Sequence, residues 1–156
     1  MKMAIKKTAE TKPKSKYEKY ILRDTVVEMP PRKKPASPYV AAVGNFWKEV
    51  EGARCNFAFS YILTAPYMFP ETPHKHDNDE FLFFVSTDPN DMKNLGAEVE
   101  VAFGEEWTKS TITTSSVIYF PKGLQHCPIF VKKLDRPFLF GHVWPMGEET
   151  NIQPSD

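Results

Sequence analysis

The sequence has few cysteines, few histidines and no excess of either charge. Its 156 residues include 2 cysteines and 4 histidines, and 20 lysines and arginines balance 20 aspartates and glutamates. Two cysteines could form one bridge but no disulfide framework, and we expect Cys55 and Cys127 to be free thiols in a reducing cytoplasm. A net charge of zero argues against nucleic acid or an anionic membrane as a partner.

Long apolar runs are absent too. No run approaches the length that a transmembrane helix needs, so we expect no membrane partner. The lysine-rich N-terminus lacks the uninterrupted apolar segment of a secretory signal. Together with the free thiols, these absences predict a cytoplasmic location.

Aromatic residues, in contrast, are abundant. They make up 13% of the chain, with 12 phenylalanines, and 41% of all residues are hydrophobic. A chain of this length and composition can form one globular domain whose interior is dominated by packed aromatic rings.

Composition divides the chain into three parts. Residues 1–37 are a lysine- and proline-rich arm, which we expect to be extended and partly mobile because it has few large apolar side chains to bury. Residues 38–146 form the expected β-barrel domain. Residues 147–156 form an irregular tail.

Short apolar segments separated by prolines and glycines predict an all-β sandwich or barrel. The clearest segment is 97–103, where small and apolar residues alternate with glutamates, as in a strand with one buried face. Helical periodicity is weak, and a single helical turn is expected at 43–50. The expected strands are 20–28, 56–64, 80–86, 97–103, 107–113, 117–120, 125–132 and 137–144.

Three of the four histidines lie in two short motifs, H-x-H-x3-E and P-x-G-x2-H, each of which precedes an apolar run. Residues two apart on a strand share a face, so the first two histidines can point into one interior. A turn separates them from the glutamate, whose direction the spacing leaves open. Imidazoles and a carboxylate suit a divalent transition metal. The candidate ligands are His74, His76, Glu80 and His126.

In this order and on β structure, the two motifs resemble those of the cupin superfamily over residues 57–144. The resemblance implies a double-stranded β-helix, which is a small barrel of jelly-roll type. It also implies that the four candidate ligands bind one divalent metal, commonly iron, manganese, nickel, zinc or copper. Three imidazoles and one carboxylate would leave coordination positions open for a small molecule.

An aromatic wall is expected beside the metal. Phe140, His142 and Trp144 share one face of the last expected strand, and Phe84 faces the barrel interior, so we expect these four side chains to contact a substrate. For His142 two positions stay open, inside the barrel or on its outer face, because both faces of its strand are apolar. Cys127, next to the second motif, should point away from the metal.

The same alternation places Phe81 and Phe83 on the outside of the barrel. Such a pair is not expected to face water. This predicts a homodimer, and the alternative is coverage by residues 20–38 of the same chain.

The motifs and the aromatic wall together predict a mononuclear metal-dependent enzyme that acts on a small organic molecule. A dioxygenase, an isomerase or epimerase, and a decarboxylase all fit the sequence, because no acid–base pair decides between them. The alternative is a non-catalytic module that binds or senses a small metabolite through the metal. A fold does not fix a function, so this alternative stays open.

Overall fold

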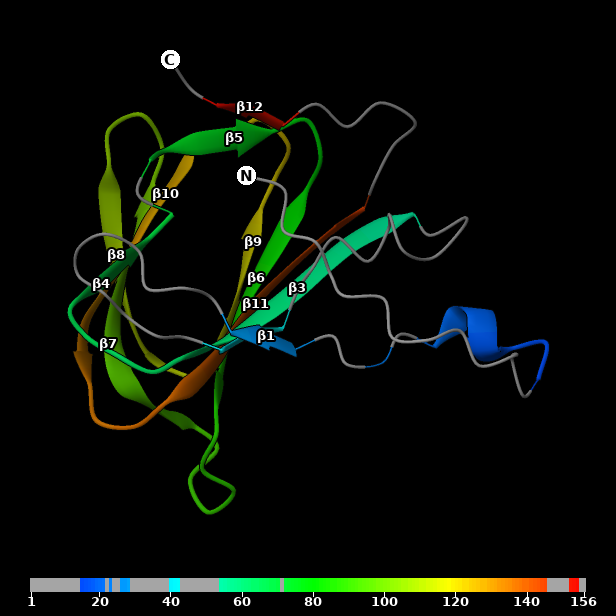
Figure 1. Ribbon diagram of the computed structural model, residues 1–156. Coiled ribbons are helices and arrows are strands. Elements are labelled where there is room, and N and C mark those ends of the chain that lie inside the picture. The colour runs from blue at the N-terminus through cyan, green and yellow to red at the C-terminus, as the bar shows by residue number, and fades with distance from the viewer. Residues whose placement is uncertain are drawn as a thin grey trace.

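The computed structural model describes residues 15–21, 23, 26–28, 40–42, 54–70, 72–145 and 152–154. Within these residues nearly all regular structure is β (Figure 1). No helix among them has the length and apolar character needed to cross a membrane. The elements are the 3-10 helix η1 (Glu18–Tyr20) and the strands β1 (Val26–Glu28), β2 (Val40–Ala42), β3 (Cys55–Ile62), β4 (Tyr67–Phe69), β5 (His74–His76), β6 (Glu80–Ser86), β7 (Asn94–Phe103), β8 (Thr108–Thr114), β9 (Ser116–Phe120), β10 (His126–Leu134), β11 (Phe138–Pro145) and β12 (Ile152–Pro154).

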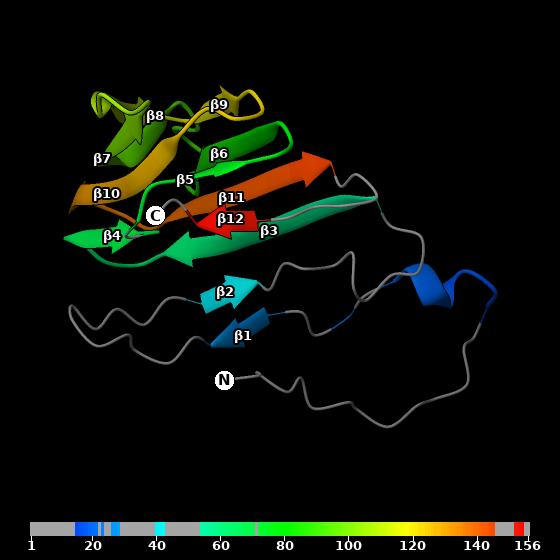
Figure 2. The same ribbon diagram turned by 90° about the horizontal axis from the view of Figure 1, so that it is seen from above.

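The strands form two antiparallel sheets that face each other. The first sheet has the order β1-β2-β3-β11-β6-β9, and the second has the order β12-β5-β10-β7-β8, with β4 paired to β10. Strands that follow one another in the chain repeatedly change sheet, as in a jelly roll. Figure 2 shows β1 and β2 continuing the first sheet beyond β3. The predicted all-β jelly-roll barrel is confirmed.

Strict alternation along the strands builds the core between the sheets. In β6, Leu82 and Phe84 are buried, whereas Phe81 and Val85 are exposed. Each fully buried large apolar side chain contributes about 1.5–3 kcal/mol relative to an exposed one. The fully buried apolar side chains include Ile62, Phe84, Leu95, Val99, Val101, Phe120, Ile129, Val131 and Phe138.

Most expected strands are present, with boundaries that differ by a few residues. The first one is wrong at its start, because Tyr20 ends a 3-10 helix, and among the described residues of 20–28 only Val26–Glu28 are strand. The expectation of an irregular tail is wrong at Ile152–Pro154, which pair with β5. The helical turn expected at 43–50, most of the arm and most of the tail lie outside the described residues. The three-part division of the chain stays a prediction.

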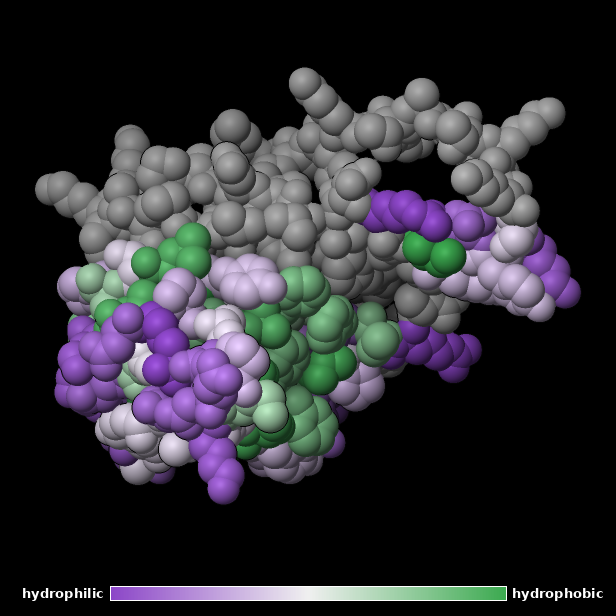
Figure 3. Space-filling view, turned by 90° about the horizontal axis from the view of Figure 1, so that it is seen from below, coloured by the Kyte–Doolittle hydropathy of each residue, from purple (hydrophilic) through white to green (hydrophobic). Residues whose placement is uncertain are grey.

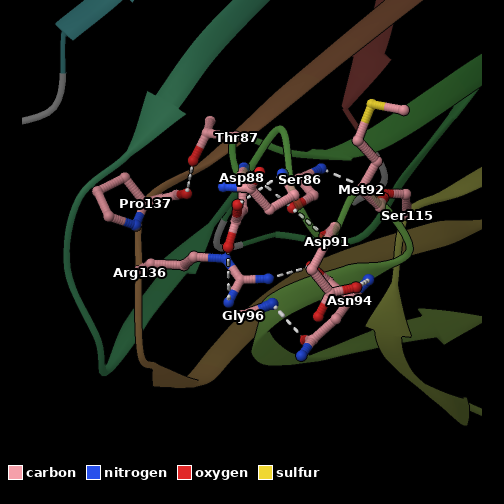
Figure 4. A network of polar contacts seen from close by, with 11 residues as sticks. Ser86, Thr87, Asp88, Asp91, Met92, Asn94, Gly96, Ser115, Arg136 and Pro137 are labelled. Atoms are coloured by element: carbon pink, nitrogen blue, oxygen red, sulfur yellow. Dashed lines mark hydrogen bonds and ion pairs between the residues drawn. The ribbon is translucent and has the colours of Figure 1, made fainter.

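One end of the sandwich, here called the closed end, is held by a network of polar contacts (Figure 4). Ser115 Oγ donates to the Met92 carbonyl at 2.5 Å and accepts from the Ser86 amide at 2.9 Å. Arg136 Nη2 donates to the Asn94 carbonyl at 2.5 Å. These bonds tie the connections β6–β7, β8–β9 and β10–β11 together. The opposite ends of β6, β10 and β11 build the site together with β5, and this end of the sandwich is here called the site end.

Candidate metal centre

Four side chains from three strands meet at the site end. His74 and His76 come from β5, Glu80 begins β6 and His126 begins β10. One donor atom from each lies within 4.8 Å of the other three. The convergence follows from the sheet register, because His126 pairs directly with His74.

Two hydrogen bonds donated by backbone amides hold the motif turns against each other. The amide of Gly123 donates to the His76 carbonyl at 2.9 Å, and the amide of Lys122 donates to Asp79 Oδ1 at 2.9 Å. Gly123 has φ +80°, a left-handed conformation that glycine adopts without steric cost. The glycine of the second motif thus shapes the turn that delivers His126.

The ring orientation of two histidines is set by backbone carbonyls. Nδ1 of His126 lies 2.9 Å from the Leu124 carbonyl, and Nδ1 of His74 lies 3.2 Å from the Thr72 carbonyl. A carbonyl oxygen only accepts, so each Nδ1 carries the proton and Nε2 of the neutral ring presents its lone pair. The ring of Phe120 stacks on His126 at 4.2 Å and holds it in this position.

Three buried donor atoms crowd together without hydrogen-bond partners. Glu80 Oε2 lies 2.9 Å from His126 Nε2 and 3.2 Å from His76 Nε2, yet none of these three atoms has a partner of hydrogen-bonding geometry. With its proton on Nδ1, a neutral His126 has no hydrogen to donate from Nε2, so its contact with the Glu80 carboxylate is favourable only when the ring is protonated or a cation lies nearby. The donor set therefore fits a divalent transition metal, whose identity it leaves open.

The charge state of the cluster suits such a cation. Burial by itself raises the pKa of Glu80, but the imidazoles of His126 and His76 outweigh burial and lower that pKa to about 2. The pKa of His74 is lowered, chiefly by burial. At neutral pH the site therefore holds an ionised carboxylate beside a neutral His74, and metal binding needs both forms.

A cavity of about 470 Å³ opens beside the four donor groups. Its wall is mainly apolar, and neither lysine nor arginine is among the residues that line it. Beyond the cluster, the wall is formed by Ser60, Ile62, Tyr67, Phe69, Pro70, Thr72, Leu82, Cys127, Ile129, Phe140, His142 and Trp144.

No protein-family model matches the sequence, and no curated protein matches it either. Solved structures do match the fold. Fe(II) HppE superposes with a TM-score of 0.51 at 13% identity, over 80% of this chain and 58% of that one. A sugar phosphate isomerase from a cupin superfamily, of Silicibacter pomeroyi, superposes with a TM-score of 0.50 at 12% identity, over 76% of this chain and 66% of that one. The chain has the cupin fold. It spans less than two thirds of either structure.

In this cupin fold, His142 lies on the inner side of β11 and lines the cavity. It stacks on Trp144 with ring centroids 4.5 Å apart, and Trp144 stacks in turn on His76 at 5.3 Å. Burial lowers the pKa of His142 to about 4, so the ring is neutral at physiological pH. The sequence left open whether His142 lies inside the barrel or on its outer face, and in the structure it lies inside.

The expected aromatic wall is present in part. Phe140 and Trp144 line the cavity, but Phe84 does not. Phe84 is fully buried and packs behind Phe140 at 5.3 Å and beside Phe138 at 6.2 Å. It supports the wall from the core.

Cys127 differs from expectation. It was expected to point away from the metal ligands, but it lines the same cavity as His126. The reason is a register shift between His126 and Ile129 together with a left-handed φ of 70° at Cys127, which interrupts the alternation of the strand. Burial raises the pKa of its thiol well above the usual range.

Sequence reasoning missed the wall contributed by β4 and its flanks. Phe69 stacks edge-on against Phe140 at 4.8 Å, and Thr72 lies between β4 and β5. β4 has only 3 residues, too few to show a period-2 pattern. The sequence feature that could have indicated β4 was the aromatic pair Tyr67 and Phe69, which are two residues apart and are flanked by Pro66 and Pro70.

Proposed function

We propose that the protein is a mononuclear metal-dependent enzyme that oxidises a small, uncharged organic molecule with dioxygen. His74, His76, Glu80 and His126 would hold one divalent transition metal. The observation that carries this proposal is the cluster of buried, partnerless donor atoms at the wall of an apolar cavity. A purely structural cluster would have its donors satisfied and would not need a cavity.

The cavity favours a substrate that is apolar except for one metal-binding oxygen. Its volume lies within the range of small-molecule sites, and the described residues of its lining include no lysine or arginine to neutralise a phosphate or a second carboxylate. Phe69 and Phe140 would hold the apolar body. The polar end would lie near Glu80, within reach of His142.

The lining also favours oxidation over isomerisation, epimerisation or decarboxylation. Proton-transfer reactions need a positioned acid–base pair. Glu80 belongs to the donor cluster, and Cys127 is kept as a neutral thiol by its raised pKa. That leaves His142 and the phenol of Tyr67 in the lining, and His142, with a pKa of about 4, is a weak base for removing a proton from carbon.

When bound, the metal would supply coordination of the substrate oxygen and activation of dioxygen. The residues around it have separate tasks. His142, neutral because burial lowers its pKa, exchanges a hydrogen bond with the polar end of the substrate. Trp144 fixes His76 by stacking, and the apolar walls exclude water from the reacting atoms.

The test is metal analysis followed by oxygen uptake. Purified protein is loaded separately with iron, manganese, nickel, copper or zinc, and its metal content is measured by elemental mass spectrometry. Each form is then offered uncharged phenols and enols, with sugar phosphates and dicarboxylates as charged controls. We expect one metal per chain, and uptake of labelled dioxygen into product with an uncharged substrate.

Two other outcomes would change the assignment. Isomerised or decarboxylated product without oxygen uptake would replace the dioxygenase assignment by one of the redox-neutral reactions. Tight stoichiometric binding of a small molecule without any product would favour the non-catalytic binding or sensing module. The cytoplasmic location and the absence of a nucleic-acid partner stay predictions.

A further inference from the structure

The two sheets are tied to each other at both ends of the sandwich. At the closed end, three connections that cross between the sheets share the polar network, and hydrophilic residues, in purple, gather on the side seen from below (Figure 3). At the site end, two described connections cross between the sheets. The turn 77–79 leads from β5 to Glu80, and the turn 121–125 leads from β9 to His126. A contact between these two turns therefore sets how Glu80 lies relative to His126.

Asp79 makes this contact with its side chain. Its Oδ1 accepts the hydrogen bond from the Lys122 amide at 2.9 Å, between residues 43 positions apart in the chain. The same carboxylate interacts with the hydroxyl of Tyr119 and raises the pKa of that phenol. Asp79 is half-buried, whereas Asp77, in the same turn, is exposed. One carboxylate thus connects the turn before Glu80 to the turn that follows β9.

Pairing between β6 and β9 holds the partners of Asp79 in place. Phe81 lies opposite Tyr119 on these strands, and their rings are 5.1 Å apart. One residue along, Glu80 lies opposite Phe120, whose ring stacks on His126 at 4.2 Å. The contact of Asp79 is therefore continuous with the packing that supports two of the metal ligands.

The turn that presents the Lys122 amide has type II geometry. The amide of Leu124 donates to the Pro121 carbonyl at 3.0 Å, and Gly123, the third residue of the turn, has φ +80°. Lys122 is the second residue, a position at which proline is favoured in this turn type. Its amide is not needed by the turn itself and donates to Asp79 instead.

We propose that Asp79 is a positioning residue, which holds Glu80 of the first sheet and His126 of the second sheet at the spacing that a bound metal needs. Glu80 is the one member of the donor cluster from the first sheet, and Asp79 itself lies outside the cluster. Without a fixed distance between the turns, a metal would have to draw the sheets together, at a cost in affinity. This role rests on the metal site of the proposed function but on no particular reaction.

The test is binding of cobalt(II), followed by visible absorption and by competition with a chelator. Lys122→Pro is compared with its matched control, Lys122→Ala. Both remove an exposed ammonium, but only proline also removes the amide hydrogen, and proline fits the second position of the type II turn. We expect Lys122→Pro to bind cobalt about 10-fold more weakly than Lys122→Ala. Its absorption bands should also shift, because the ligands are held at a different spacing.

Substitutions of Asp79 itself separate position from charge. Asp79→Ala and Asp79→Asn both remove a negative charge near the cation, but the asparagine oxygen can still accept the Lys122 amide. We expect Asp79→Ala to lose about 10-fold in cobalt affinity and Asp79→Asn to retain most of it. Asp77→Ala removes the exposed acid of the same turn and should bind cobalt as Asp79→Asn does. Circular dichroism reports whether each variant is folded.

The outcomes distinguish the positioning role from the metal site. Equal affinities and equal spectra in folded Lys122→Pro and Lys122→Ala would overturn the positioning role alone. So would an Asp79→Asn protein that loses as much affinity as Asp79→Ala, because charge would then account for the loss. A wild-type protein that binds no cobalt would overturn the metal site and the positioning role together.

Discussion

Three strands, β6, β10 and β11, run between the site end and the closed end of the sandwich, yet the two ends use opposite chemistry. β6 runs from Glu80 at the site end to Ser86 at the closed end, and β10 runs from His126 to Leu134. At the closed end most polar groups are paired, with Arg136 Nε an exception, and the adjoining interior is apolar. At the site end, Glu80 and His126 are as deeply buried as the core, but their facing atoms have no partner.

This difference separates stability from function within one small domain. Buried polar atoms without partners destabilise a fold, so the core of the closed end has to offset their cost. The comparison therefore predicts that substitutions at the site end affect metal binding, whereas those at the closed end affect unfolding.

The largest expected effect is that of Glu80→Gln. The amide keeps the shape of the side chain but removes the only anionic donor of the cluster, so metal affinity should fall about a thousandfold, or about 4 kcal/mol. Competition with a chelator measures the affinity. Glu98→Gln, on the outer face of the second sheet, is the matched control and should bind metal as the wild type does. Unchanged affinity in Glu80→Gln would contradict the donor assignment.

Phe138→Ala should have the next largest effect, on stability. Phe138 is fully buried near the closed end and contacts Phe84, so its loss leaves a cavity that costs about 3–4 kcal/mol in the free energy of unfolding. Urea titration measures this loss, with the exposed Val117→Ala as the control. Folded Phe138→Ala should retain its metal affinity, and a large loss of affinity would show that the two ends are not separable.

His142→Phe should reduce the acid sensitivity of the metal-free protein. The pKa of His142 is about 4 in the folded state against an ordinary value of 6.5, so below pH 6.5 the unfolded chain binds a proton that the folded chain rejects. Stability from this group is complete above pH 6.5 and is lost as the pH falls towards 4, by on the order of 3 kcal/mol. Unfolding free energies at several pH values should show a shallower slope for His142→Phe. Identical slopes would contradict burial of a neutral His142.

Arg136→Met should have the smallest effect. The guanidinium donates to the Asn94 carbonyl and lies 3.9 Å from Asp88 at the closed end, where it is partly exposed. Its loss should cost about 1 kcal/mol of stability and leave metal affinity unchanged. Lys133→Met, whose ion pair with Asp135 is largely exposed, is the control and should cost less. A loss equal to that of Phe138→Ala would mean that the network contributes as much as the core.

Much of the fold could be predicted locally. The expected strand at 80–86 coincides with β6, because its alternation of buried and exposed residues reflects the pleat of a single strand. Short strands gave weaker signals. β12 at Ile152–Pro154 was missed, because a 3-residue strand exists only through its pairing with β5.

Composition and period-2 geometry are enough to fix which residue types are available for the site and which of them share a strand face. The packing of the strands is needed to bring His126 to His76 and Glu80, to turn His142 inward and to place Cys127 at the cavity. These outcomes depend on the register between distant strands, because a shift of one residue turns every side chain of a strand to the opposite face of its sheet. The register is fixed by turns and bulges that pack against other parts of the chain. A local sequence pattern contains no information about this packing.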